Sequence, residues 1–525
     1  MSKLVSAAAA VQRIKDGATV LVDGSGGGIN EPGAILDALE ARFANEVQPS
    51  GLTVVHPSGM GDGQGGGMDR LAHKGMVRRV IGGHWNWCRG MQRLATTEQI
   101  EAYCLPQGVL SHLLRAIAGH GPGVITQVGL GTFVDPRRGG GRLNARARDT
   151  LVELIELKGR EYLFYAAFPV DVAIIRGTTA DEDGNITMED EGLFAETLSA
   201  AQAARNSGGI VIAQVRNIVP PHTLDPRRVK VPGVLVDAVV HVPAQRLSFA
   251  TDHDPTLVGA ARTAATDVPL MPLSERKVIA RRAAGELRHA DIVNLGFGMP
   301  DGVAAVLAEE AQGHAVTLTV EQGHIGGVPV GGADFGLARN QSAMLDAGYQ
   351  FDWYDGGGLD IAILSFAQVD PEGNVNVSKF GDRIAGIGGF VNISQGAKRV
   401  VFVGTMRAGK QELEFTPDGI RIGREAPSAK FVKEVDQISF SGEYARRWGK
   451  PVLFVTERAV FELGPEGLVL IEVAPGLDVE QDVIGQMQFR PQVSSALRRM
   501  DKRLFGEATM GLQLGGKAAP QETVR

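Results

Sequence analysis

The sequence has little cysteine and no long apolar run. Its 525 residues include only two cysteines, Cys88 and Cys104, which are too few for a disulfide framework and fit a reducing cytoplasm. No stretch of about 18 apolar residues occurs, so we expect no membrane-spanning helix. The apolar stretch 4–11 is followed at once by charged residues and not by a cleavage site of small residues. It therefore predicts an amphipathic helix and not a signal peptide, and we expect a cytoplasmic protein with no membrane partner.

Basic charge is also scarce. The chain has 53 Lys and Arg residues against 60 Asp and Glu residues, a formal net charge of −7. Wrapping nucleic acid requires a basic face that neutralises phosphates, so nucleic acid is not an expected partner. The 11 histidines form no His-x-x-x-His pair with an acid, and the cysteines are too far apart in sequence for a paired ligand motif. No metal site is therefore expected.

Three familiar catalytic patterns are incomplete or missing. Gly24, Gly26 and Gly27 follow a β-rich run but do not complete the Gly-x-Gly-x-x-Gly of a dinucleotide site. The tripeptide 334–336 matches the Asp-Phe-Gly of kinases, yet no His-Arg-Asp loop accompanies it. The Gly-x-Ser-x-Gly elbow of an α/β-hydrolase is absent. The arginine run 137–148 lies beside glycines and is interpreted as a solvated loop or a subunit contact.

Glycine, in contrast, is plentiful. The 69 glycines include clusters at 26–28, 65–67, 139–141 and 356–358, and apolar runs separate these clusters. The chain is therefore not a low-complexity linker. Glycine clusters after strands mark places where the backbone turns sharply or approaches a ligand closely.

Two stretches of the sequence repeat at a single offset. Residues 171–188 resemble residues 360–377, and the same offset of 189 carries 207–215 onto 396–404. A third pair, 18–28 and 290–300, repeats a β-rich run that enters a Gly-x-Gly turn. Each half alternates short apolar strands with helical segments, which predicts two related, open, mostly parallel α/β domains with an active site between them. The first half is longer by an insertion near 56–150.

The repeat also predicts the domain boundaries. The first domain is expected over 1–255 and the second, which carries the chemistry, over 274–508. Between them, residues 256–273 lose the strand pattern and predict a linker, and Ser274 is placed as the N-cap of a helix. The Gly-rich and polar segment 509–525 predicts a flexible tail.

Glu321 is the most informative candidate for catalysis. It directly follows the β-rich run 315–320 and precedes Gly323, Gly326 and Gly327. Ligands of open α/β sheets bind at the carboxyl ends of strands, and N–H groups freed in a glycine loop can face a developing oxyanion. With a reference pKa of about 4.3, a glutamate is ionised at neutral pH and needs no adjacent base to act as a nucleophile. The residues alone leave open that Glu321 is an exposed loop carboxylate.

Nine short segments, in one order along the chain, resemble landmarks of the family I CoA-transferases. The likeness is strongest to the propionate and acetate CoA-transferases that fuse both halves in one chain, and it extends from near the N-terminus to about residue 505. Each segment is weak alone, and their shared order makes the resemblance specific. The segments are 103–118, 128–137, 161–165, 206–215, 294–300, 319–327, 373–381, 386–393 and 456–463.

The resemblance implies a function and a mechanism. Glu321 matches the nucleophile of the family's Glu-x-Gly motif, which attacks an acyl-CoA to give an acyl-glutamyl anhydride and then a glutamyl-CoA thioester. Such covalent catalysis gives ping-pong kinetics. Acyl-CoA and a short-chain carboxylate are the implied partners, coenzyme A is a substrate, and no other cofactor is needed. A homo-oligomer, a dimer or a tetramer, is also implied.

The resemblance implies further site residues from both halves. One set is expected to meet the acyl or carboxylate oxygens: Gly26, Gly27, Gln107, Gly323, Gly388 and Gly389. A second set is expected to contact coenzyme A: Gly296, Phe297, Gly298, Met299 and Pro300. For each glycine the alternative is a tight turn with no other role.

Two positions depart from the family's pattern. Gln322 and His324 flank the nucleophile where a small residue, and often proline, is expected. They predict an acid bulkier or more polar than acetate, unless His324 only packs in its loop. Two other functions also stay open: an acyl-CoA hydrolase that uses the same Glu321 with water, and an acyl-CoA-binding protein without turnover. The sequence does not name the acid.

Overall fold

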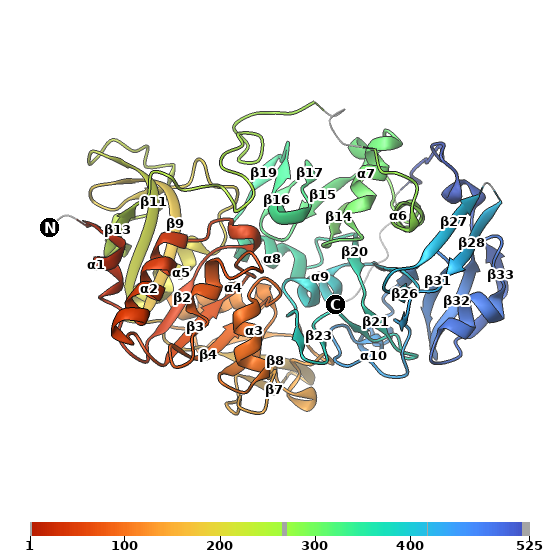
Figure 1. Cartoon of the computed structure of the whole chain (residues 1–525), viewed down its shortest axis with the longest axis horizontal. Helices are drawn as coiled ribbons and strands as arrows, with labels where there is room; N and C mark the ends of the chain where they lie inside the picture. The colour runs from red at the N-terminus through yellow and green to blue at the C-terminus, as the bar shows by residue number, and fades with distance from the viewer. Residues whose placement is uncertain (1–2, 265–269, 417, 517–525) are drawn as a thin grey trace.

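The chain forms two α/β halves that lie side by side, the first drawn in red to yellow and the second in green to blue (Figure 1). The computed structural model describes residues 3–264, 270–416 and 418–516. Each half contains one ten-stranded sheet. The prediction of two related, mostly parallel α/β sheets is therefore confirmed.

The first sheet has eight strands in one parallel path. Their order across the sheet is β1 (Leu4–Val5), β13 (Ala238–His241), β11 (Ile210–Val219), β9 (Val172–Asp181), β2 (Thr19–Val22), β3 (Leu52–His56), β4 (Val77–Gly82) and β5 (Glu101–Cys104). All neighbours in this path pair in parallel. The short antiparallel strands β10 (Ile186–Thr187) and β12 (Val229–Val231) complete it. Its helices are α1 (Ala7–Val11), α2 (Gly33–Glu46), α3 (Arg89–Thr96), α4 (Gln107–Ala118) and α5 (Thr197–Asn206).

The second sheet has a parallel centre, flanks that join it by antiparallel pairing, and a last strand that pairs in parallel. The centre runs β15 (Thr317–Val320), β14 (Ile292–Leu295), β20 (Ile361–Ser365), β25 (Val400–Val403) and β30 (Val452–Val455). One flank adds β16 (His324–Ile325) and β19 (Ala343–Met344), and the other adds β31 (Ala459–Gly464), β32 (Gly467–Val473) and β33 (Gln492–Arg499). Its helices are α6 (Glu275–Ala284), α7 (Asp301–Glu309), α8 (Ala347–Asp355), α9 (Phe390–Gly396) and α10 (Gly442–Arg447).

Smaller sheets surround these two. A three-stranded sheet in the first half is made of β6 (Gly123–Thr126), β8 (Arg160–Ala166) and β7 (Val152–Leu157). The second half has five strand pairs: β17 (Val328–Pro329) with β18 (Ala338–Arg339), β21 (Gln368–Val369) with β22 (Val375–Asn376), β23 (Lys379–Phe380) with β24 (Arg383–Ile384), β26 (Arg407–Ala408) with β29 (Ser428–Ala429), and β27 (Glu412–Thr416) with β28 (Gly419–Arg424).

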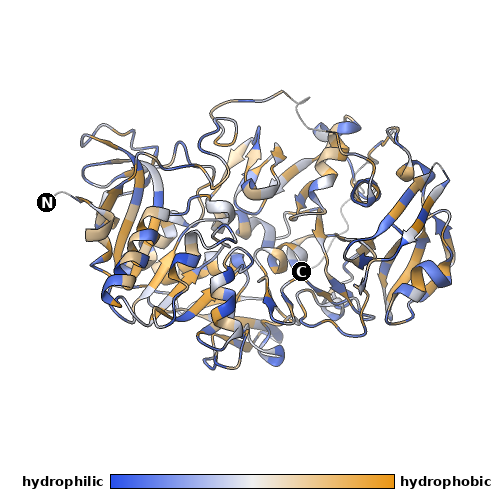
Figure 2. Ribbon diagram, viewed as in Figure 1, coloured by the Kyte–Doolittle hydropathy of each residue, from blue (hydrophilic) through white to orange (hydrophobic). Residues whose placement is uncertain are grey.

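The central strands are apolar because helices and loops cover them on both faces. All ten residues of β9 are buried, as expected for a strand inside a parallel sheet. Figure 2 shows hydrophobic residues concentrated along the strands and hydrophilic residues on the outer helix faces and loops. Among the described residues, no helix is both long and apolar enough to cross a membrane.

The internal repeat is visible in hydrogen bonds that recur at matching positions. The Asp171 carboxylate accepts the N–H of Thr19 at 2.8 Å, and the Asp360 carboxylate, 189 residues later, accepts the N–H of Ile292 at 3.0 Å. The strand registers likewise make Thr19 in the first sheet equivalent to Ile292 in the second. This equivalence differs by one residue from the predicted alignment of 18–28 with 290–300. That alignment was wrong by one position because it matched the Gly-x-Gly turns, which lie outside the strand ladders.

The ends and the connection between the halves pack on the sheets. The predicted helix 4–11 is in part the strand β1, since its first residues pair with β13 at the sheet edge. The Ser274 side chain caps α6, as predicted. Within the predicted tail, the N–H groups of Met510 and Leu512 donate to the Glu310 carboxylate at 2.5 and 2.8 Å. Residues 265–269 of the predicted linker and 517–525 of the tail lie outside the described residues, and the domain boundaries stay a prediction.

Candidate active site

Glu321 lies at the carboxyl end of β15, directly after its last residue. Its side chain is buried, with 8% of the residue exposed, so it is not a solvated loop carboxylate. The Oε2 atom has no hydrogen-bond partner among the described residues. The Oε1 atom lies 3.4 Å from the amide nitrogen of Gln322, a weak contact. A buried carboxylate oxygen without a partner is costly and marks a group kept available for another purpose.

Burial changes the acidity of Glu321. Loss of solvent raises its pKa above the usual value, and its own backbone N–H and the amides of Asn294 and Gln322 oppose this effect. A raised pKa of a carboxyl group means that the charged form is destabilised. Glu321 therefore ionises less readily than a solvated glutamate. The same destabilisation makes the ionised oxygen more reactive.

Of the two predicted glycines 388 and 389, only one has a free N–H. The Gly388 N–H donates to the Gly83 carbonyl at 2.8 Å. The Gly389 N–H donates to no acceptor among the described residues. Gly389 precedes α9, and a methyl group at this residue would lie 3.3 Å from Cγ of Glu321. Gly389 therefore lies beside the Glu321 side chain and has an N–H without an acceptor among the described residues, and its oxygen-binding role stays a prediction.

Gln107 comes from the first half to the same place. It begins α4, which packs against α8 and α9 of the second half. Its backbone N–H donates to the Gly388 carbonyl at 2.9 Å. Its side-chain Oε1 lies 3.8 Å from where a methyl group on Gly388 would be, and its amide has no partner among the described residues. The structure thus brings Gln107 beside the Gly388–Gly389 pair.

The first glycine loop lies where the halves meet. Gly27 packs against the backbone of Ala333, so no side chain would fit there. A methyl group on Gly26 would lie 2.7 Å from the indole nitrogen of Trp87. Gly27 therefore permits close packing between the halves, and Gly26 permits close packing within the first half.

Gly323 makes a turn. Its φ is +120°, its N–H donates to the Val320 carbonyl at 3.0 Å, and its carbonyl accepts the N–H of Leu345 at 2.8 Å. Because the N–H is already used, Gly323 is not available as an oxyanion donor in this structure. The turn positions the backbone that carries Glu321. Gly323 thus matches the alternative given for each glycine, a tight turn.

The predicted coenzyme A loop follows β14 and stays open to solvent. Phe297 is 49% exposed, and its ring lies 5.0 Å from that of Phe335 and 6.5 Å from that of Trp87. The Gly298 carbonyl accepts a hydrogen bond from Arg276 at 2.9 Å. Within 296–300, Met299 is partly buried and Pro300 directly precedes α7. The loop thus forms an accessible aromatic surface near the first glycine loop.

Gln322 and His324 are both buried next to the nucleophile. The Gln322 Oε1 atom has no partner among the described residues, and its side chain lies against Gly336. His324 is close to the backbone of Gly192 in the first half, and burial lowers the pKa of its imidazole to about 4. The influence of these two residues on the choice of acid stays a prediction.

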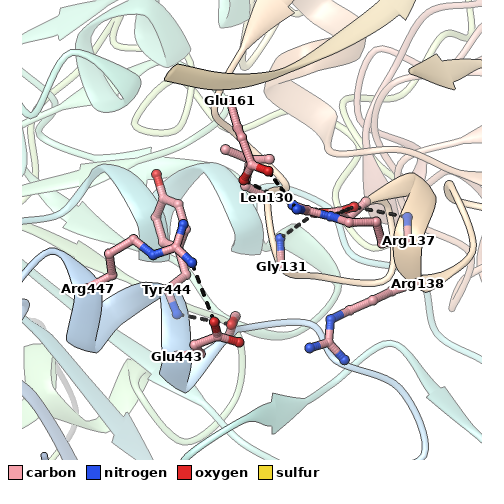
Figure 3. Close-up of a pocket in the computed structure, with 10 residues that line it drawn as sticks. Leu130, Gly131, Arg137, Arg138, Glu161, Glu443, Tyr444 and Arg447 are labelled. Carbon is pink, nitrogen blue, oxygen red and sulfur yellow. Dashed lines mark hydrogen bonds and ion pairs between the residues drawn. The ribbon is translucent and has the colours of Figure 1, made fainter. Parts of the chain in front are cut away.

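The arginine run lies away from this group of residues. Arg137 and Arg138 line a cavity of about 300 Å³ between the halves, together with Glu161, Glu443 and Arg447. Figure 3 shows the contacts from Arg137 to Glu161 and from Arg447 to Glu443, at 2.8 and 3.4 Å. None of the residues predicted for catalysis lines this cavity.

Sequence reasoning missed the segment 83–87 of the first half. His84 and Trp87 from this segment lie beside Gly388 and Gly26, respectively. No catalytic motif includes them, and the segment falls in what the repeat shows only as an insertion. The only signal was the unusual density of aromatic and imidazole side chains in His-Trp-Asn-Trp.

Comparison with known proteins gives a consistent result. A family model described as coenzyme A transferase matches residues 4–242. The chain is 46% identical to the caffeate CoA-transferase of Acetobacterium woodii over 98% of this chain and 99% of the relative. It is 43% identical to the acetate CoA-transferase YdiF of Escherichia coli strain K12, over 97% and 96% of the two chains.

Solved structures agree. The apoenzyme of the acyl-CoA transferase YdiF from Escherichia coli O157:H7 superposes with a TM-score of 0.94, at 42% identity and over 98% of both chains. The thioester complex of that enzyme with CoA superposes with a TM-score of 0.93, again over 98% of both chains. The likeness therefore covers both halves and their arrangement.

Proposed function

The chain belongs to the coenzyme A transferase family, and on that basis we propose that it moves coenzyme A between short-chain carboxylic acids through a thioester on Glu321. The observation that carries the proposal is the buried Glu321 carboxylate, which has an oxygen without a partner among the described residues and lies beside Gly389, whose N–H has no acceptor there. A nucleophile and an oxyanion donor are thereby next to each other.

In the first half-reaction, a carboxylate oxygen of Glu321 attacks the carbonyl carbon of an acyl-CoA. The carbon–sulfur bond breaks, which leaves an acyl-glutamyl anhydride and a CoA thiolate. The thiolate attacks the Glu321 carbonyl carbon, the anhydride carbon–oxygen bond breaks, and the first acid departs as its carboxylate. No proton is gained or lost overall. A second carboxylate then repeats these steps in reverse and leaves as its CoA thioester.

The neighbouring groups stabilise the charge that moves in these steps. Both attacks put negative charge on a carbonyl oxygen, and the Gly389 N–H is free to receive it. The Gln107 amide, also without a partner, is placed to hydrogen-bond the acid. Removing one oxyanion donor costs about 2.7–4 kcal/mol in known enzymes. A donor that is already in position needs no reorganisation during the reaction, so a fixed Gly389 N–H would lower the barrier to each attack.

The remaining properties complete the proposal. Coenzyme A approaches along the exposed turn 296–300, and the mechanism requires no metal and no further cofactor. We infer a homo-oligomer in the cytoplasm from the resemblance and from the low cysteine content. The acid is left to experiment, because one relative is named for caffeate and another for acetate. A panel of acids should therefore include both small and aromatic carboxylates.

Burial of Glu321 favours transfer over hydrolysis, since water has little access to the thioester. The test mixes the enzyme with acetyl-CoA and varies propionate, caffeate and other acids. Formation of the new CoA thioester, with parallel double-reciprocal plots, supports ping-pong transfer. Loss of acetyl-CoA that does not respond to any acid indicates the hydrolase, and binding with no turnover indicates the inactive binding protein.

A further inference from the structure

A short backbone pairing connects the two halves beside Glu321. Trp85 donates its N–H to the Ala385 carbonyl at 2.8 Å, and Ile387 donates its N–H to the Gly83 carbonyl at 2.9 Å. His84 lies between these bonds and forms a bridge with Gly386. The bonds fix the backbone of His84 against the loop that carries Gly388 and Gly389.

The His84 side chain lies beside this glycine pair. Its Cδ2 atom is 3.6 Å from where a methyl group on Gly388 would be, and Oε1 of Gln107 is 3.8 Å from the same point. A methyl group on the next residue, Gly389, would lie 3.3 Å from Glu321. Consecutive Cα atoms are about 3.8 Å apart. His84 and Gln107 therefore lie beside Gly388, and Glu321 lies beside the adjoining Gly389.

The imidazole of His84 is available for a ligand. It makes no hydrogen bond and no ion pair with any described residue, although it is only partly exposed. Burial, followed by the nearby His56, lowers the pKa of His84 to about 4. At neutral pH the ring is uncharged, so one nitrogen donates and the other accepts. The ring is partly exposed and has no partner among the described residues, so it is free to donate to a bound substrate.

His56 shows what a structural histidine looks like in the same region. It is buried at the end of β3, and its Nδ1 atom lies 2.8 Å from the Ser58 carbonyl. That contact holds the ring in one orientation and uses its donor. His84 has no such contact, and the difference separates a ring that supports the fold from one that is kept free.

We propose that His84 binds the substrate by donating a ring N–H to an oxygen of the acyl group, which is the carboxylate of the free acid or the carbonyl of its CoA thioester. This inference rests on the proposed transfer through Glu321. The Gln107 amide and the Gly389 N–H, which have no partner among the described residues, lie at adjoining positions. The first half thus contributes a substrate-binding side chain from outside the segments that resemble the family.

The test follows the mass of the protein after rapid mixing with acetyl-CoA in the absence of acid. His84→Phe keeps an aromatic ring but has no ring N–H, and His84→Gln retains a donor. As a control, His314→Phe replaces an exposed histidine elsewhere. We expect the rate of CoA adduct formation to fall about 10²-fold in His84→Phe, by comparison with loss of one active-site donor. His84→Gln should recover much of the rate, and His314→Phe should match the wild type. Circular dichroism melts identify any variant that fails to fold.

Each outcome decides the point. A wild-type adduct that forms equally fast in His84→Phe and His84→Gln overturns the role of His84 and leaves the proposed function standing. Equal slow rates in two folded His84 variants, with no recovery by Gln, would assign His84 a packing role and also contradict the inference. No adduct on the wild type with any acyl-CoA of the panel, although the enzyme binds them, overturns the proposed function and this inference with it.

Discussion

The two halves share one strand framework but differ in the residue that follows an equivalent strand. Thr53 in β3 and Thr317 in β15 occupy matching places in their ladders. Four residues later the first half has Pro57, and the second has Glu321. A repeated fold therefore supplies two similar strand ends, and only one of them carries a nucleophile. The first half contributes Gln107 and His84, which lie beside Gly388.

Buried acids also differ between the halves. In the first half, the Asp23 carboxylate accepts the N–H of Glu196 and the hydroxyl of Thr197, and Glu196 in turn accepts the hydroxyl of Ser111. In the second half, the amides of Asn294 and Gln322 lie near the Glu321 carboxylate, and its Oε2 atom has no hydrogen-bond partner among the described residues. A buried carboxyl group is thus not by itself a sign of catalysis. What distinguishes Glu321 from this pair is its place at a strand end beside Gly389, whose N–H has no acceptor among the described residues.

The largest expected effect comes from removing the residue that distinguishes the halves. Glu321→Gln should lower CoA transfer by about 10⁴-fold or more, because a neutral amide cannot form the anhydride. Adding Pro57→Glu to this variant should restore nothing, since residue 57 follows β3 of the first half and the coenzyme A loop follows β14 of the second. Steady-state transfer rates measure both. Glu462→Gln changes an exposed acid in the same half and serves as the control. Near wild-type transfer by Glu321→Gln would refute the assignment of the nucleophile.

The next largest effect separates two adjacent glycines. Gly389→Ala places a methyl group 3.3 Å from Glu321, and we expect transfer to fall about 10²-fold, as happens when reacting groups are misplaced by an ångström. Gly389 has φ of −79°, so alanine adds no backbone strain. Gly388→Ala is the matched variant: its N–H is already bonded, and φ of +53° makes the change cost about 1–2 kcal/mol of stability. Equal transfer rates in the two folded variants would contradict the role of Gly389.

The raised pKa of Glu321 predicts how transfer depends on pH. Only the ionised carboxylate attacks, so the rate of adduct formation should fall about tenfold per pH unit once the pH is below this pKa. Because burial raises the pKa, the midpoint should lie above the usual value of about 4.3. Single-turnover rates across pH, with wild-type fold checked at each pH, provide the profile. A midpoint at or below the usual value would show that Glu321 is solvated before it reacts.

The smallest effect concerns stability in the first half. Burial raises the pKa of Glu31 to about 8, against the opposing effects of the Gly61 N–H and Arg176. Between the ordinary pKa of a glutamate and about 8, the folded state therefore holds a proton that the unfolded chain has released. The bound proton stabilises the folded state, and this stabilisation is lost as pH rises through about 8. Glu31→Gln should remove this loss, which is at most about 1.4 kcal/mol per pH unit. Urea unfolding between pH 5 and 9 measures it; parallel curves for wild type and variant would contradict the shift.

The sequence was sufficient where one segment determines the result. An apolar run followed by Glu321 correctly predicted a strand with the acid at its carboxyl end, and the offset of 189 predicted two related sheets. It was insufficient where distant segments meet. His84 pairs with Gly386, about 300 residues away, and nothing in either segment predicts that pairing. Likewise, whether the N–H of Gly323, Gly388 or Gly389 is free depends on tertiary acceptors that the motifs do not show.

The most direct test of the central claim is peptide mass mapping of the enzyme after mixing with acetyl-CoA or propionyl-CoA and no acceptor acid. We predict a CoA adduct on the peptide that contains Glu321, discharged when a carboxylate is added and absent in Glu321→Gln. An adduct on a different residue, or one that persists in Glu321→Gln, would contradict the claim that this strand end carries the nucleophile.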